Sequence, residues 1–144
     1  MNIDEFIKIS NTNIKELIHK NLTKNFYTFE SKEIPKEKGV YFIFRKSNKE
    51  LVYIGCAKER TLKKRLHDYV GKSTKASFRR KIIKNELNIA EENNKNIVEK
   101  ATQYIKENFV LKFIIIHNDY TSSEIELIER ACITLEKPKY NDKI

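Results

Sequence analysis

Residues 39–55 of this 144-residue chain read GVYFIFRKSNKELVYIG, and this stretch decides the fold. Two runs rich in aromatic and β-branched side chains, 40–45 and 51–55, flank the polar segment KSNKE. Such side chains favour extended backbone, and a short polar connection between two such runs is typical of a β-hairpin. We therefore predict that 40–45 and 51–55 form an antiparallel pair of strands.

On both sides of the hairpin, the spacing of apolar residues changes to a helical repeat. It predicts an N-terminal helical extension over 1–33 and helices near 62–70, 75–87, 97–105 and 123–136. Ser123 and Glu126 are spaced as a capping box for the last of these helices. The continuous apolar run 109–116 predicts a buried central strand. The expected fold class is α+β, with a small, mostly antiparallel three-stranded sheet flanked by helices.

The composition argues for one domain without a membrane span. With 144 residues, 40% of them hydrophobic, the chain is long enough for a substantial core but short for two domains. Because no run of 18 apolar residues occurs, we expect no transmembrane helix, and the start MNIDEFIKIS lacks the features of a secretory signal. Cys56 and Cys132 form no CxxC pair, which argues against a disulfide scaffold or zinc site and predicts a cytoplasmic location.

Positive charge is concentrated in one segment. The net charge of the chain is +9, and residues 58–84 hold eleven Lys and Arg residues against two acidic ones, so this segment accounts for the whole excess. Such localisation focuses the electrostatic field on one side of a molecule and favours a polyanionic partner, above all nucleic acid. An anionic membrane surface is less favoured, because no amphipathic helix here combines this charge with a large apolar face.

Four fragments occur in a fixed order along the chain. They are Gly39-Val40-Tyr41, Tyr53-Ile54-Gly55, the helical LKKRL of 62–66 followed by Tyr69, and a C-terminal helix in which Glu129 precedes Asn141 by 12 residues. Together they resemble the GIY-YIG nuclease family over residues 34–141, and the last fragment resembles the nuclease domain of the bacterial repair excinuclease in particular. The resemblance implies a nuclease core over 34–144, within a single domain of residues 1–144.

Two features differ from the excinuclease pattern. The loop between Gly55 and Arg65 is about two residues longer, so Arg60 or Lys64 also competes for the arginine position, although the Leu-x-x-Arg-Leu-x-x-Tyr context favours Arg65. Residues 71–108 exceed the minimal core and form a predicted basic helical insertion. This insertion resembles those of the enlarged restriction and phage members of the family, which bind DNA without a separate recognition domain.

The resemblance implies a metal-dependent DNA endonuclease that activates water with a tyrosine. Tyr53 would be the base, Tyr41 would orient the water, and Arg65 would offer a planar, permanently charged fork to the phosphate. Glu129 would hold one Mg²⁺ (or Mn²⁺), with waters completing the shell. The implied catalytic set is Tyr41, Tyr53, Arg65, Tyr69, Glu129 and Asn141, with Asn141 as a brace.

The predicted substrate is DNA, most simply double-stranded, bound through phosphates by the basic segment. The expected DNA-binding residues are Lys63, Lys64, Lys75, Arg79, Arg80, Lys81 and Lys84. On the predicted C-terminal helix, Glu129 shares a face with Ile125 and Cys132, which should turn it toward the sheet. A non-catalytic nucleic-acid-binding module that keeps the fold is the competing interpretation. Each polar position of the motif set is filled by a competent residue, which favours the enzyme.

Overall fold

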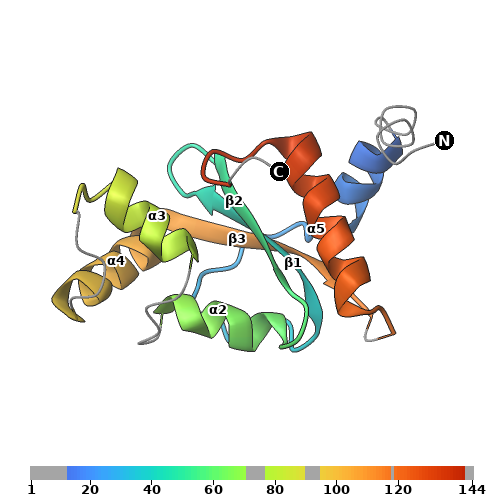
Figure 1. Cartoon of the computed structure of the whole chain (residues 1–144), viewed down its shortest axis with the longest axis horizontal. Helices are drawn as coiled ribbons and strands as arrows, with labels where there is room; N and C mark the ends of the chain where they lie inside the picture. The colour runs from blue at the N-terminus through green and yellow to red at the C-terminus, as the bar shows by residue number, and fades with distance from the viewer. Residues whose placement is uncertain (1–12, 71–76, 90–94, 118, 142–144) are drawn as a thin grey trace.

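A three-stranded antiparallel sheet forms the centre of the computed structural model, which describes residues 13–70, 77–89, 95–117 and 119–141 (Figure 1). The strands are β1 (Lys38–Arg45), β2 (Leu51–Ala57) and β3 (Phe109–Ile116). The predicted hairpin and the α+β class are confirmed. The spatial order is β2-β1-β3, so the prediction that 109–116 is the central strand was wrong, and β1 is central. A continuous apolar run indicates that a strand is buried. An outer strand is also buried when another segment of the protein packs over its edge.

Other segments cover both outer strands. Residues 22–27 run beside β3, where Leu22 pairs with Ile114 and Tyr27 with Leu111. The predicted helical extension over 1–33 therefore fails after residue 21: the described helix spans 13–21, and the residues after it satisfy the outer backbone groups of β3. At the other edge, the Tyr140 backbone N–H donates to the Val52 carbonyl of β2 at 2.8 Å.

Helices cover both faces of the sheet (Figure 1). One face carries Tyr41, Ile43 and Phe113 and packs against α2 (Leu62–Val70), α3 (Ser77–Asn85) and α4 (Lys95–Asn108). The opposite face carries Val40, Phe42 and Ile114 and packs against helix 13–21 and α5 (Ser122–Glu136). Successive side chains of β1 point alternately to the two faces, so β1 contributes to the hydrophobic core on both sides of the sheet. Among the described residues, no helix is long and apolar enough to cross a membrane.

The start of α5 differs from the prediction by two residues. Thr121, not Ser123, is the N-cap, and Glu124, not Glu126, completes the capping box. The segment TSSEIE contains two overlapping Thr/Ser-x-x-Glu patterns, and the one that the structure uses leaves Glu126 able to pair with Lys58 at 3.0 Å. The two helices predicted within 71–108 are present as α3 and α4. Ser73 and Thr74 are of the residue types preferred at a helix N-cap, so the sequence predicts one of them as the cap of α3, but both lie outside the described residues.

Candidate active site

Tyr41 and Tyr53 lie together on the face of the sheet that α3 covers. In the hairpin register Tyr41 pairs with Gly55 and Tyr53 with Ile43, which makes the tyrosines diagonal neighbours. Their ring centroids are 6.4 Å apart. Tyr41 is 1% exposed, whereas Tyr53 is half-buried. Of the two, Tyr53 therefore combines a packed ring with access to solvent.

Gly55 leaves the space that the ring of Tyr41 fills. A Cβ atom at this position would lie well inside van der Waals contact with Cζ, Oη and Cε2 of Tyr41. The ring therefore packs directly over the backbone of β2. A glycine is needed here for close approach, since the Gly55 backbone does not have a positive φ.

Asn141 fixes the segment between Tyr53 and Gly55. Its side-chain Nδ2 donates to the Ile54 carbonyl at 2.8 Å, and its Oδ1 accepts from the Ile54 backbone N–H, also at 2.8 Å. A single amide side chain thus satisfies both backbone groups that Ile54 presents at the open edge of β2. The tail after α5, residues 137–141, covers this edge as a short strand would.

A groove of about 260 Å³ opens where β2 ends. Its lining residues are Cys56, Ala57, Lys58, Glu59, Arg60 and Arg65. Arg65 comes from α2 and is half-buried, while Arg60 is exposed in the preceding loop. Both arginines that compete for the family position therefore border the same groove. Tyr69 lies in the last turn of α2, where the side chains fall outside the described residues.

Glu129 reaches this region from α5. It is half-buried between the fully buried Ile125 and Cys132, as its position on the helix predicted. Burial raises the pKa of Glu129, and a hydrogen bond with the Cys56 thiol partly opposes the rise. Burial and the nearby Glu129 raise the pKa of Cys56 to about 12, so this thiol is protonated at neutral pH and can donate.

The metal-ligating side chains near the groove are few. Among the described residues, no group of three or more His, Cys, Asp or Glu side chains could hold a metal ion. The neighbouring carboxylate of Glu126 is paired with Lys58 at 3.0 Å and with Arg130 at 3.4 Å. Glu59 lines the groove and Glu129 contacts Cys56, so each could offer a carboxylate oxygen to a cation.

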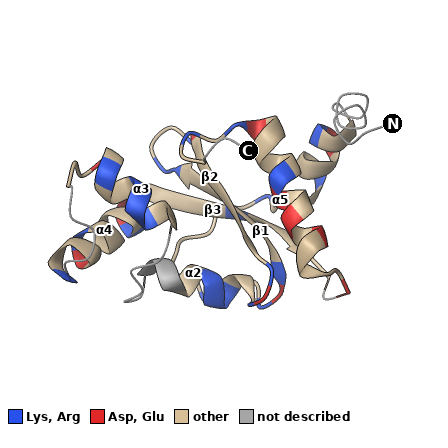
Figure 2. Ribbon diagram, viewed as in Figure 1, with Lys and Arg blue, Asp and Glu red and all other residues tan. Residues whose placement is uncertain are grey.

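The predicted DNA-binding residues are not all at the surface. Figure 2 shows Lys and Arg positions on both α2 and α3. Arg80 and Lys84 of α3 and Lys64 of α2 are exposed, while Lys63 and Lys81 are partly exposed. Lys75 lies outside the described residues. Arg79, predicted to contact DNA, is 1% exposed.

The burial of Arg79 follows from its place on α3. It lies four residues before the buried Ile83 and directly after the buried Phe78, so it belongs to the inward face of the helix. The helical spacing of the apolar residues therefore already indicated that Arg79 is buried. A count of charges along the sequence does not show this. Phe78 contacts the ring of Tyr53, with centroids 5.4 Å apart, so α3 also forms a wall of the tyrosine site.

Sequence reasoning missed a polar cluster centred on Glu86. Its carboxylate accepts two hydrogen bonds from Arg45, at 2.9 and 3.1 Å, one from Tyr104 at 2.8 Å and one from Tyr140 at 2.6 Å. Burial by itself raises the pKa of Glu86, but these hydrogen bonds outweigh it and hold the pKa below its usual value. Burial and the bond to Glu86 raise the pKa of Tyr140 to about 12. The four residues are far apart in sequence, so no local pattern indicates them.

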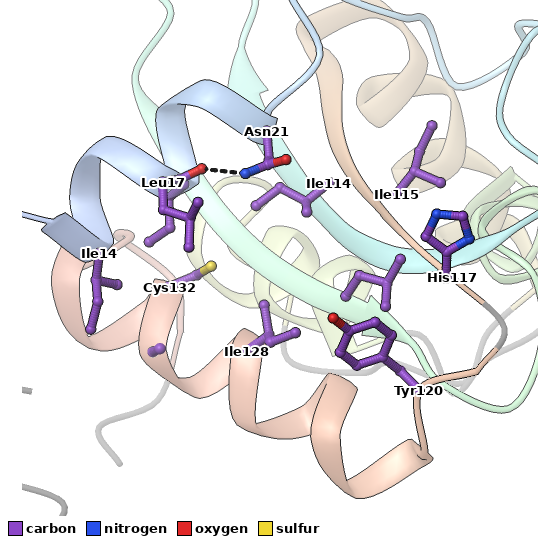
Figure 3. A pocket seen from close by; sticks show the side chains of 12 residues that line it. Ile14, Leu17, Asn21, Ile114, Ile115, His117, Tyr120, Ile128 and Cys132 are labelled. Atoms are coloured by element: carbon purple, nitrogen blue, oxygen red, sulfur yellow. Dashed lines mark hydrogen bonds between the residues drawn. The ribbon is translucent and has the colours of Figure 1, made fainter.

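A second hollow, of about 420 Å³, lies on the opposite face of the sheet (Figure 3). Helix 13–21, the end of β3 and α5 line it mainly with aliphatic side chains such as Leu17, Ile114 and Ile128. Among its described lining residues there is no carboxylate, and His117 is the one basic side chain. The described lining of this hollow therefore offers no carboxylate to a metal ion and no Lys or Arg to a phosphate.

Comparison with known proteins agrees with the motif order. The family model of the GIY-YIG catalytic domain matches residues 37–141, and the chain belongs to this family of nuclease domains. The N-terminal endonuclease domain of UvrC from Thermotoga maritima, in a form bound to its catalytic divalent cation, is 25% identical. That match covers 77% of this chain and 89% of that chain with a TM-score of 0.42. A magnesium-bound structure of the same domain is also 25% identical and covers 76% and 89%, with a TM-score of 0.42. No curated protein matches the chain.

Proposed function

We propose that the chain is a metal-dependent endonuclease that hydrolyses phosphodiester bonds in double-stranded DNA. One observation carries the proposal: residues 53–60 lie beside each candidate site residue whose side chain the structure describes. Tyr53 contacts Tyr41, Ile54 is held by Asn141, Cys56 contacts Glu129, and the groove after Cys56 is shared with Arg65. A base, a cation for phosphate and a carboxylate for metal thus border a single segment.

In the proposed mechanism, the phenolate form of Tyr53 accepts a proton from the attacking water and becomes the neutral phenol. A tyrosine is a weak base at its ordinary pKa of about 10, so nearby positive charge must favour its phenolate. Arg65 and Arg60 border the adjacent groove and can supply this charge, and either guanidinium can bind two phosphate oxygens. Tyr41, which is buried, would orient the water, and Asn141 would keep the Tyr53–Gly55 backbone in place.

Glu129 fits the role of metal ligand. A carboxylate oxygen is a hard donor of the type that Mg²⁺ or Mn²⁺ prefers, and the groove beside Cys56 has room for the waters that Mg²⁺ retains. A bound cation would polarise the phosphate and stabilise the leaving oxygen. It would also offset the desolvation that raises the pKa of Glu129.

Incubation of the protein with supercoiled plasmid, with and without Mg²⁺, tests the proposal directly. We expect nicked or linear product only with the metal. Tyr53→Phe should reduce the rate about 10²- to 10⁴-fold, as expected for loss of a general base. Glu129→Gln should abolish cleavage while DNA binding persists, because the metal ligand is lost and a negative charge near the phosphates is removed.

Glu124→Gln is the matched control for Glu129→Gln. It removes one carboxylate from the same helix at an exposed position, and glutamine can still complete the capping box with Thr121. It should cleave at the wild-type rate. A wild-type protein that binds DNA without cutting it would favour the non-catalytic module instead, and a Glu129→Gln variant that still cuts would exclude Glu129 as the ligand.

We also infer that 71–108 is an insertion within the nuclease core and that the protein acts in the cytoplasm. The packing of α3 and α4 against the same face of the sheet as α2 supports one domain. The free Cys56 and Cys132 suit a reducing compartment.

A further inference from the structure

The C-terminal tail and the insertion meet at one carboxylate. Glu86 lies just after α3, and its Oε2 accepts a hydrogen bond from the phenol of Tyr140 at 2.6 Å. Tyr140 immediately precedes Asn141, which holds both backbone groups of Ile54. Hydrogen bonds on both sides of the peptide link between residues 140 and 141 therefore connect the insertion, through the tail, to the strand segment that carries Tyr53.

Glu86 itself is firmly held. Its side chain is 10% exposed and receives the bidentate fork of Arg45 from β1, the same strand that carries Tyr41. The Arg45 guanidinium in turn lies over the ring of Phe109, 5.2 Å from its centroid. A charge-assisted, largely buried carboxylate is a rigid anchor, because its oxygens have several fixed donors and little water to exchange with.

The anchor matters because the tail is attached at an edge of the sheet. At the open edge of β2, residues 140 and 141 are joined to the strand by the Tyr140 N–H to the Val52 carbonyl and by the Asn141 bonds to Ile54. Such an edge contact opens more readily than the interior of a sheet. The Glu86–Tyr140 bond restrains the residue next to Asn141.

We propose that Glu86 and Tyr140 are positioning residues of the active site, acting through Asn141 to hold the Tyr53–Gly55 backbone against the insertion. This rests on the proposed function for its catalytic consequence. The Tyr53 ring also packs on Phe78 of α3, so the insertion contacts the reactive tyrosine through its ring and secures the backbone beside it through Glu86.

Two phenols on the same carboxylate provide a matched pair of variants. Tyr140→Phe and Tyr104→Phe each remove one hydroxyl that donates to Glu86, at 2.6 and 2.8 Å, and each leaves the ring. Tyr104 belongs to α4, whereas Tyr140 belongs to the tail. If Glu86 served only to stabilise the fold, the two variants would behave alike.

Amide hydrogen exchange of Ile54 is a readout that does not depend on cleavage. Tyr140→Phe should speed exchange of this amide about tenfold or more, as expected for loss of a hydrogen bond to a charged group. The exchange rates of amides in the central strand β1 should rise only as much as any loss in the global free energy of unfolding explains. Tyr104→Phe should leave the exchange rate of the Ile54 amide, measured relative to the β1 amides, near its wild-type value.

The same variants are compared in plasmid cleavage with Mg²⁺. Tyr140→Phe should lower kcat about tenfold while KM and DNA affinity stay within about twofold, because the basic surface is unchanged. Glu86→Gln, which keeps the shape of the side chain, should also speed Ile54 exchange beyond the change that it causes in the amides of β1. Equal effects of Tyr140→Phe and Tyr104→Phe, or an unchanged kcat despite faster Ile54 exchange, would overturn the proposal. If the wild-type protein does not cut DNA, the proposed function fails, and Ile54 exchange still decides whether Glu86 holds the tail.

Discussion

At the scale of single residues, Gly55 decides where the ring of Tyr41 can lie. Gly55→Ala would place a methyl group where Cζ, Oη and Cε2 of Tyr41 now lie, and the ring is too deeply buried to swing away freely. We expect a loss of about 1–3 kcal/mol in the free energy of unfolding, as for other overpacked cores. If the proposed function holds, we also expect a larger relative loss of nuclease activity, because the displaced phenol belongs to the proposed site.

Gly39→Ala is the comparison for this prediction. A Cβ at Gly39 would meet the Ile114 backbone carbonyl of β3, which cannot move without disturbing the sheet. This variant should therefore lose stability at least as strongly as Gly55→Ala. Chemical denaturation and plasmid cleavage measured on both variants separate damage to the sheet from damage at Tyr41. If Gly55→Ala retained full activity, the position of the Tyr41 phenol would be irrelevant to catalysis.

At the scale of elements, α3 has a buried face and an exposed face, and the order of charges along the sequence does not separate them. Arg79 is buried with Phe78 and Ile83, whereas its neighbour Arg80 is exposed. Arg79→Ala should lower the free energy of unfolding by about 2–4 kcal/mol, because a large buried side chain is removed. Arg80→Ala should change stability little and weaken DNA binding instead.

The salt dependence of DNA affinity distinguishes these two roles. Log affinity should fall with log salt at a slope of about −0.9 for each phosphate that the protein neutralises. Arg80→Ala should make this slope shallower by about one phosphate, and Arg79→Ala should leave it unchanged. An Arg79→Ala protein that stays fully stable but shows the shallower slope would mean that Arg79 reaches DNA after all.

At the scale of the whole molecule, Glu86 joins β1, α4 and the tail after α5, and its stabilising effect depends on pH. The pKa of Glu86 is lower in the folded protein than the ordinary value of about 4.3. A depressed carboxyl pKa stabilises the fold above the unfolded-state pKa, and this contribution disappears as pH falls through the folded-state pKa. Folding stability should therefore drop in acid.

Glu86→Gln tests this link between charge and stability. At neutral pH it should cost about 3 kcal/mol, the order expected when one partner of a buried ion pair is removed. The free energies of unfolding of the variant and the wild type, measured with denaturant, should converge as pH falls from about 7 past the unfolded-state pKa of about 4.3 and on through the lower folded-state pKa. A difference that stays constant over this range would show that the carboxylate charge is unimportant.

Local pattern was enough to predict the elements and much of the site. The hairpin, the strand 109–116, the helices α2 to α5 and the inward turn of Glu129 follow from side-chain period, which acts over a few residues. Family membership followed from four fragments in order, now matched over residues 37–141. The roles of the six site residues stay predictions.

The tertiary structure decided what depends on contacts between distant segments. The central place of β1, the cover that residues 22–27 give to β3 and the Asn141 bonds to Ile54 all require chain brought together from far apart in sequence. The same holds for the Glu86 cluster, whose members at 45, 86, 104 and 140 share no local pattern. A charge count along the chain also cannot tell a buried arginine from an exposed one, because burial depends on what packs against the helix. Sequence alone therefore determined which side chains are available for the chemistry, and only the packing of distant segments decided which of them are brought together and held in place.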